Sequence, residues 1–381
     1  MKKRHLFGLF AMAVFACVSC SQDEVVSQSP DVNKAIEFGT YVGRDASSRA
    51  SEIKIENLAI KGFGVFAYHT TGNFVEGDDQ NTTDVEVASS CNFMFNQLVH
   101  GKKGGTTEAP TYATDSWEYS PLKYWPNNTS DKLTFFAYAP YEAGSNGNII
   151  LPSTAPEGVP SLTFNVGTDV EKHQDLLFTL PQLNKVNNNS SVDFAFEHAL
   201  ARIGFKAEVS DELDEYTTIT IKKVELIGKF YSKGTMSLKD GSWSPESQSN
   251  NITFKLESTA NDFADEGNIF GKDNITERQL NSNNNYIMII PQDFTVNGID
   301  SPLQMIVEYN VFTDLNKDGN KDVNDSMITN TITSQDFKLN FSQGTAYSLS
   351  IVIGMASIKF SASVADWGDE EETEIVWTSG N

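Results

Sequence analysis

The fold class is decided by the stretch Tyr347-Ser348-Leu349-Ser350-Ile351-Val352-Ile353-Gly354. Its apolar side chains recur at every second position, which is the period of a β-strand with one buried face. The next stretch, residues 358–364, has the same alternation, and so do residues 203–209 and 252–256. No segment longer than about ten residues keeps a helical period, which argues against α/β folds. The sequence therefore predicts an all-β, sandwich-like fold.

One strand-like stretch, residues 218–226, changes phase midway. Ile219 and Ile221 share one parity, whereas Val224 and Leu226 have the other. An extra residue in one strand of a pair, a β-bulge, would shift the alternation in this way. We therefore predict a bulge within this strand.

The first twenty residues indicate export. A basic start at residues 2–4 precedes an uncharged run over residues 6–18, which is too short for the about 20 apolar residues of a transmembrane helix. The run ends with a small residue before Cys20, so we predict a lipoprotein signal peptide over residues 1–19 and acylation of Cys20. Two alternatives remain open: modification at Cys17, and a plain cleaved signal peptide.

Acidic residues dominate the chain, whose formal net charge is −23. Removal of residues 1–19 takes away three basic and no acidic residues, which makes the mature charge −26. Such a surface repels phosphate backbones, so we expect no nucleic-acid partner. It also disfavours binding to anionic lipids by charge, which leaves the acyl chains on Cys20 as the outer-membrane anchor.

The length of the mature chain favours two domains. A polar run at residues 187–191 has the loop composition expected of a linker. We predict a flexible tether over residues 20–34, an N-terminal sandwich over 35–186 and a C-terminal sandwich over 192–381.

Motifs for catalysis are missing from the sequence. There is no H-E-x-x-H, no G-x-S-x-G and no P-loop, so we do not expect an enzyme. His198 shares a predicted strand face with Phe194 and Phe196, which favours a hydrogen-bonded core histidine over a ligand or a base. Cys91 is expected to be a small core residue and not a nucleophile.

Oxygen-bearing side chains at residues 314–325 match the spacing of a calcium loop, with Gly319 at the sixth position. The candidate ligands are Asp314, Asn316, Asp318, Asn320, Asp322 and Asp325. Asp325 stands where an EF-hand has a longer glutamate, and the flanking residues read as strands, so the site would be a calcium-stapled hairpin loop. The alternative is an ordinary turn, because Asp, Asn and Gly are preferred turn residues. The sequence suggests no cofactor besides this calcium.

A cluster of aromatic residues offers a candidate carbohydrate platform, because sugar rings stack on exposed aromatic faces. The cluster consists of Trp117, Tyr119, Tyr124 and Trp125. Packing in the sandwich interior is the alternative.

Seven short stretches occur in a characteristic order: residues 35–40, 48–50, 62–68, 117–126, 133–140, 194–201 and 289–292. Together with the predicted lipoprotein signal that ends at Cys20, they resemble the fimbrillin-like (Mfa-like) proteins of Bacteroidetes, the subunits and accessory proteins of donor-strand-assembled pili. Residues 21–24 likewise resemble the acidic surface-export tag of Bacteroidetes lipoproteins. The resemblance implies two tandem β-sandwiches of the transthyretin-like or immunoglobulin-like type.

The resemblance also implies assembly by strand exchange, in which a strand from one chain completes the sheet of another. A trypsin-like protease would cut after an arginine, release the first strand and let a neighbour's C-terminal strand replace it. Residues 35–42 correspond to the first strand, and one of its faces carries Ile36, Phe38, Thr40 and Val42. We expect cleavage at Arg49, with Arg44 as the alternative; both arginines could equally be ordinary loop residues.

The donor strand, if the chain has one, is expected near the C-terminus. Residues 358–364 are one candidate, although they could instead be the last strand of the second domain, and residues 374–377 are the other. The apolar positions of the two candidates are Ile358, Phe360, Ala362, Val364, Ile375 and Trp377.

Taken together, the sequence predicts a fimbrial subunit, or an accessory or tip adhesin, that is lipid-anchored in the outer membrane at the cell surface. Its partners would be other fimbrial subunits, and a host protein or glycan for an adhesin. The alternative is a monomeric outer-membrane surface lipoprotein that binds a glycan or another host ligand through loops at the sandwich ends.

Overall fold

The structure is a computed structural model that describes residues 34–42, 53–77, 87–144, 147–188, 190–210, 213–246, 250–257, 269–273, 275–281, 285–296, 302–354, 358–367 and 373–377. Within these ranges the chain forms five β-sheets and two short helical segments, α1 (Ile55–Lys61) and the 3-10 helix η1 (Val170–Lys172). The prediction of an all-β, sandwich-like fold is confirmed. No helix in the described ranges is both long enough and apolar enough to span a bilayer.

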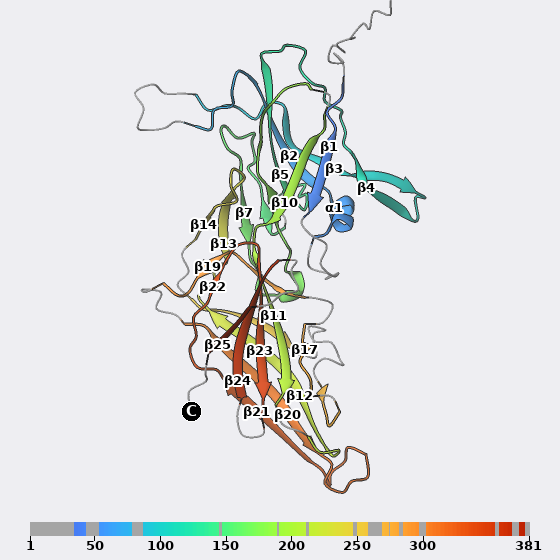
Figure 1. Ribbon diagram of the computed structural model, residues 1–381, viewed down its shortest axis with the longest axis vertical. Coiled ribbons are helices and arrows are strands. Elements are labelled where there is room, and N and C mark those ends of the chain that lie inside the picture. The colour runs from blue at the N-terminus through green and yellow to red at the C-terminus, as the bar shows by residue number, and fades with distance from the viewer. Residues whose placement is uncertain are drawn as a thin grey trace, which may run out of the picture.

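The first sheet lies at one end of the long axis of the molecule (Figure 1). Its strands, in spatial order, are β1 (Phe38–Val42), β10 (Val192–His198), β8 (Leu177–Thr179), β5 (Asp131–Ala139), β2 (Phe63–Thr71), β3 (Met94–Gly105) and β4 (Pro110–Glu118), with β9 (Gln182–Lys185) also paired to β5.

The second and third sheets lie toward the other end of the long axis (Figure 1). The second sheet has the order β17 (Arg278–Gln279), β11 (Ala201–Val209), β23 (Thr345–Ile353), β24 (Ile358–Asp366) and β25 (Thr373–Trp377), with β18 (Ile287–Ile289) also on β11. The third sheet has the order β15 (Ile252–Glu257), β12 (Thr217–Gly228), β20 (Gln304–Thr313) and β21 (Ser326–Thr333), with β16 (Ile269–Phe270) also on β12.

Two smaller sheets complete the fold. The fourth consists of β14 (Trp243–Pro245), β13 (Lys233–Ser237), β7 (Ser161–Asn165) and β6 (Ile149–Ile150), and the fifth of β19 (Gln292–Asp293) and β22 (Asn340–Phe341). In the fourth sheet β7 pairs with β13, so strands from the two halves of the sequence share one sheet.

The first sheet is buried on both faces at its centre. In β2, Phe63 and Val65 belong to one hydrophobic cluster, whereas Phe66 and Tyr68 point to the opposite face and belong to a second cluster. This second cluster continues into the second and third sheets, for example through Phe205 of β11. The core therefore runs without interruption from one half of the molecule to the other.

The predicted linker at residues 187–191 does not separate two domains. It connects β9 to β10, and both strands belong to the first sheet. β10 was expected to open the C-terminal sandwich, but it pairs with β8 and β1 instead. The boundary prediction failed because a polar loop inside a sheet has the same composition as a loop between domains. The predicted bulge is confirmed, since the pairing of β12 with β20 shifts register between Ile221 and Lys223.

Candidate functional site

β1 is an edge strand. It pairs in parallel with β10, from Phe38 opposite Val192 to Val42 opposite Phe196, and stands at the end of the strand order of the first sheet. Figure 1 shows β1 and β10 side by side near one end of the molecule. An edge strand has a sheet neighbour on only one side, so it can leave without breaking pairs between other strands.

The residues just before β1 are held on the opposite side. The backbone N–H of Ile36 donates to Lys123 O at 2.9 Å, and that of Trp125 donates to Lys34 O at 3.1 Å. The hydroxyl of Tyr119 donates to Ile36 O at 2.9 Å. Departure of the strand would therefore break these few contacts as well as the pairing with β10.

The inward face of β1, together with Ile36 just before it, fills a hydrophobic cluster. Ile36 is 1% exposed, Phe38 is 7% exposed, and Val42 packs against the same cluster. Phe38 is surrounded by four aromatic rings at centroid distances of 5.3 to 6.4 Å; they belong to Tyr119, Phe194, Phe135 and Phe63. The outward side chain of Tyr41 is 59% exposed. The predicted inward face of this strand is thus the observed one.

We define the first-strand site as residues 34–42 together with β10, residues 119–125 and the hydrophobic cluster beneath them. It brings together several stretches that lie far apart in the sequence, including residues 35–40, 117–126 and 194–201. The sequence indicated each stretch separately, but it did not show that Tyr119 would hold the carbonyl of Ile36 or that Phe38 would stack on Phe194.

The three residues predicted to be modified or cleaved are not part of the described structure. Cys20, Arg44 and Arg49 lie outside the described residues. The chain is described again from Ile53, whose backbone N–H donates to Oδ2 of Asp175 at 3.0 Å. α1 begins two residues later, at Ile55.

His198 has the hydrogen bond that the sequence suggested. Its Nδ1 lies 3.0 Å from Oδ2 of Asp175, which is fully buried, and its ring stacks on Trp367 with centroids 4.0 Å apart. The side chain keeps 17% exposure, so it lies at the margin of the core and not within it. The sequence gave no indication that Asp175, Ile53 and His198 would meet, because they come from three separate segments.

The two donor-strand candidates occupy different positions in the second sheet. β24, which contains Phe360, Ala362 and Val364, pairs with β23 on one side and β25 on the other. β25, which contains Ile375 and Trp377, has β24 as its only neighbour in the described structure. β24 belongs to the second sheet as an inner strand and is not the last strand, because β25 follows it and forms the edge in the described structure.

The loop at residues 314–325 forms hydrogen bonds with its own backbone. The carboxylate of Asp314 accepts the N–H groups of Lys317 at 2.6 Å and Gly319 at 2.8 Å, and Asp325 accepts those of Leu315 and Asp322. Asn316, Asp318 and Asp322 each accept the N–H of the residue two positions later, as side chains of turns do. No group of three or more His, Cys, Asp or Glu side chains placed to hold a metal occurs among the described residues, which include this whole loop. These hydrogen bonds are those of an ordinary turn, the alternative interpretation, and the calcium site stays an untested prediction.

The aromatic platform is not present as a surface. Tyr119 and Trp125 are buried, and Trp117 packs against the cluster and lies 5.3 Å from the ring of Phe63. Only Tyr124 of the four is largely exposed. The alternative, packing in the sandwich interior, is the arrangement observed for Trp117, Tyr119 and Trp125, which fill the interior beside β1.

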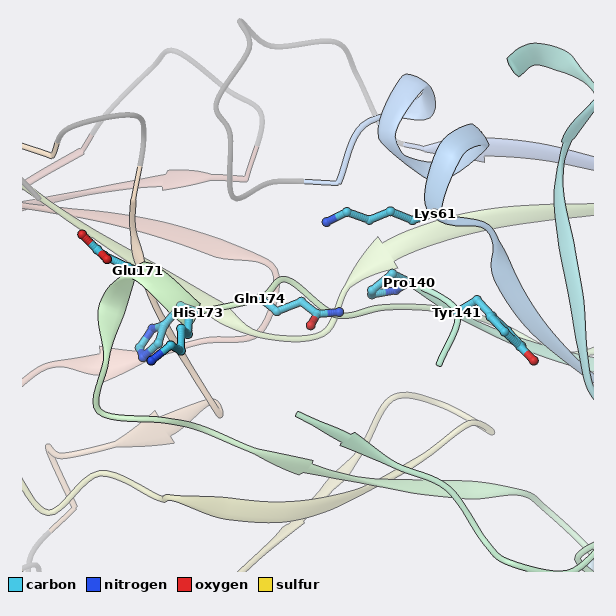
Figure 2. Close-up of a pocket in the computed structure, with 7 residues that line it drawn as sticks. Lys61, Pro140, Tyr141, Glu171, His173 and Gln174 are labelled. Atoms are coloured by element: carbon cyan, nitrogen blue, oxygen red, sulfur yellow. The ribbon is translucent and has the colours of Figure 1, made fainter. Parts of the chain in front are cut away.

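A cavity of about 400 Å³ lies between the end of α1 and the segment after η1 (Figure 2). It is lined by Lys61, Pro140, Tyr141, Glu171, Lys172, His173 and Gln174. His173 has no free ring nitrogen, since Nε2 lies 2.8 Å from Gly167 O and Nδ1 accepts the N–H of Met288. Lys172 is paired with Asp169, whose pKa is lowered by that hydrogen bond. Neither ring nitrogen of His173 is therefore free to act as a base toward the cavity.

Cys91 is the small core residue that its sequence context suggested. It is 4% exposed, and its thiol donates to Met94 O at 3.0 Å. Burial raises the pKa of the thiol to about 11, which keeps it protonated and unreactive near neutral pH.

The fold and the site define an all-β sandwich protein whose first strand is an apolar edge strand. The model of the fimbrillin-like family matches residues 48–367, and the chain therefore belongs to that family. It is 27% identical over 400 aligned residues to the fimbrium subunit Fim1C of Phocaeicola vulgatus, with 96% of this chain and 97% of that protein covered. Its fold is similar to the crystal structure of a fimbrial protein from Bacteroides vulgatus ATCC 8482, with a TM-score of 0.63 and 23% identity over 88% of this chain and 100% of the other.

Proposed function

We propose that the protein is a fimbrial subunit that assembles by donor-strand exchange after its first strand is released. Membership of the fimbrillin-like family supports the fimbrial part of this proposal. The observation that carries the exchange part is the position of β1, an edge strand whose side chains nevertheless complete a hydrophobic cluster. Its loss would uncover Phe194, Phe63 and Phe135 together with the unpaired edge of β10, and an incoming strand would restore both.

The parallel pairing of β1 with β10 supports replacement by another strand. Parallel ladders are slightly less stable per residue than antiparallel ladders. A donor that ran antiparallel to β10 would form better-aligned hydrogen bonds than β1 does, while its alternate side chains entered the space left by Ile36 and Phe38. This difference would favour the assembled state over a return of β1.

Release of β1 requires a cut between it and α1. Residues 43–54 connect the two and contain Arg44 and Arg49, and we propose Arg49 as the cleavage site with Arg44 as the alternative. Before cleavage, acylated Cys20 would tether the subunit to the outer membrane at the cell surface. Cleavage would then free the subunit from the lipid and open the acceptor site in the same step.

β25 is the better donor candidate of the two. Removal of β24 would split the second sheet, because β24 pairs with both β23 and β25. β25 can leave its own sheet with the loss of one set of pairs, and it carries Ile375 and Trp377 at alternate positions. A subunit that lends β25 to its neighbour would act in the stalk, whereas one that keeps it could only accept a strand.

The test is to determine the N-terminus of the protein in assembled surface material, in cells that express the wild-type chain, Arg49→Gln, Arg44→Gln or both substitutions. Glutamine keeps a long polar side chain but lacks the positive charge that a trypsin-like protease requires at the cleaved residue. We expect wild-type material to begin at Ala50 and to form oligomers that survive mild detergent. The double variant should keep its lipidated N-terminus and stay monomeric. A double variant that still polymerises with β1 attached would refute the proposal.

A further inference from the structure

The third sheet has an exposed edge that the first-strand site does not use. β21 forms this edge and pairs only with β20 among the described strands. It lies toward the opposite end of the long axis from β1 (Figure 1). Met327 is 67% exposed and Ile328 is 56% exposed, so the edge also shows apolar side chains to solvent.

The two edges of this sheet differ in charge. β15, at the other edge, carries Lys255 and Glu257, which form an ion pair at 2.8 Å. β21 reads SMITNTIT over eight residues and contains no charged residue and no proline. Charges and prolines are the usual devices that keep sheet edges from pairing with other chains. β21 lacks both, in a chain that carries a net charge of −23.

The central sequence of β21, Ile328-Thr329-Asn330-Thr331-Ile332, is a palindrome. Read from Asn330 outward, Thr329 and Thr331 correspond to each other, and so do Ile328 and Ile332. If two copies paired antiparallel with Asn330 on a two-fold axis, threonine would face threonine and isoleucine would face isoleucine. Facing threonines hydrogen-bond across antiparallel strands, and facing isoleucines remove apolar surface from water.

The isoleucines of such a pair would join the core side of the sheet. Ile328 lies opposite Val311 of β20, and Ile332 lies opposite Val307, which is buried. Ile332 and Val311 already pack against the second hydrophobic cluster, the one that contains Phe66 and Phe205. A second copy of β21 would cover the exposed Ile328 with the partner's Ile332, and the two third sheets would become one continuous sheet.

We propose that β21 is a self-association surface through which two copies of this chain pair edge to edge about a two-fold axis at Asn330. A second copy fits better than an acidic or basic partner, because the strand offers no charge to either one and matches its own reversed sequence. A closed two-fold contact uses the same patch on both copies. The contact is small, so it is weak between free subunits and strengthens when subunits are held together in a fibre.

This surface is independent of strand exchange, so it is tested on the uncleaved chain with β1 in place. The variant Thr329→Lys/Thr331→Lys places lysine opposite lysine twice across the axis, because residue 329 of one copy faces residue 331 of the other. The matched variant Thr329→Glu/Thr331→Lys places glutamate opposite lysine twice. The side chains of Thr329 and Thr331 are exposed in each copy, so neither variant disturbs the core.

Sedimentation equilibrium should show concentration-dependent dimers for the wild type. The Lys/Lys variant should dimerise at least about fivefold more weakly, since like charges directly opposite each other destabilise a strand pair. The Glu/Lys variant should dimerise as well as the wild type or better. Equal behaviour of the two variants, or a wild-type chain that stays monomeric at every concentration, would overturn the proposal.

Disulfide trapping tests the register. Asn330→Cys places two thiols opposite each other on the axis, and it should give a covalent dimer under mild oxidation. Thr253→Cys, an exposed position on the charged edge strand β15, is the control and should not. The native Cys91 is buried and does not interfere. Trapping through residue 253 but not through residue 330 would show that the copies pair elsewhere.

Discussion

The substitution Phe38→Ala tests whether β1 is an energetically important part of the folded subunit. Phe38 is 7% exposed and lies within 6.4 Å, centroid to centroid, of four aromatic rings. Full burial of a phenylalanine side chain contributes roughly 2 to 3 kcal/mol, and each well-placed ring pair adds about 0.5 to 1.5 kcal/mol. Measured Phe→Ala substitutions in cores cost about 3 to 5 kcal/mol, and we expect about 3 kcal/mol here because an edge strand can relax into part of the space.

Urea denaturation of the uncleaved chain measures this cost, with Tyr41→Ala as the control on the same strand. Tyr41 is 59% exposed, so its replacement should change the free energy of unfolding by no more than about 0.5 kcal/mol. Hydrogen exchange should also speed up at the β10 amides that pair with β1, since the weakened strand detaches more often. A Phe38→Ala cost below about 1 kcal/mol, or one equal to that of Tyr41→Ala, would refute the view that β1 completes the core.

Three further predictions follow from single groups. Burial lowers the pKa of His173 from 6.5 to about 4. Between these pH values the unfolded chain binds more protons than the folded chain. The free energy of unfolding should therefore fall as the pH drops through this window, by roughly 3 kcal/mol at most. Urea titrations of the wild type and His173→Gln should show a weaker pH dependence for the variant; parallel curves would be inconsistent with this pKa. Calcium should leave the melting temperature unchanged, because no three acidic side chains of the Asp-rich loop converge among the described residues; a concentration-dependent rise would show that the loop binds the cation. The Cys91 thiol, buried and with a pKa of about 11, should react with a thiol reagent only on unfolding, and fast labelling of the native chain would contradict its placement.

Local alternation was sufficient to predict the fold class and individual strands. Residues 347–353 and 358–364 fall within β23 and β24, and the phase slip in residues 218–226 is a bulge at the expected place. Alternation reports which side chains of one strand share a face, and burial enforces it wherever that face meets the core. The burial of Ile36 and Phe38, which share one face of the predicted first strand, was predictable for the same reason.

Long-range pairing was not predictable from local patterns. β10 follows a polar loop that reads like a linker, yet it joins the first sheet between β8 and β1. The aromatic residues Tyr119 and Trp125 could have formed a surface or a core, and only the position of β1 beside them decides for the core. The Asp-rich loop matched a calcium motif in spacing, but ligand geometry depends on where each carboxylate points, which spacing does not determine.

The central claim is that β10 loses β1 and gains a strand from another subunit. The most direct measurement is mass spectrometry with hydrogen exchange on assembled material, compared with the uncleaved monomer. We predict that assembled subunits lack residues 34–42 and yet keep the β1-facing amides within Val192–Phe196 protected, because a foreign strand has taken the place of β1. Assembled subunits that still contain β1, or that lack it and exchange freely at these amides, would contradict the account.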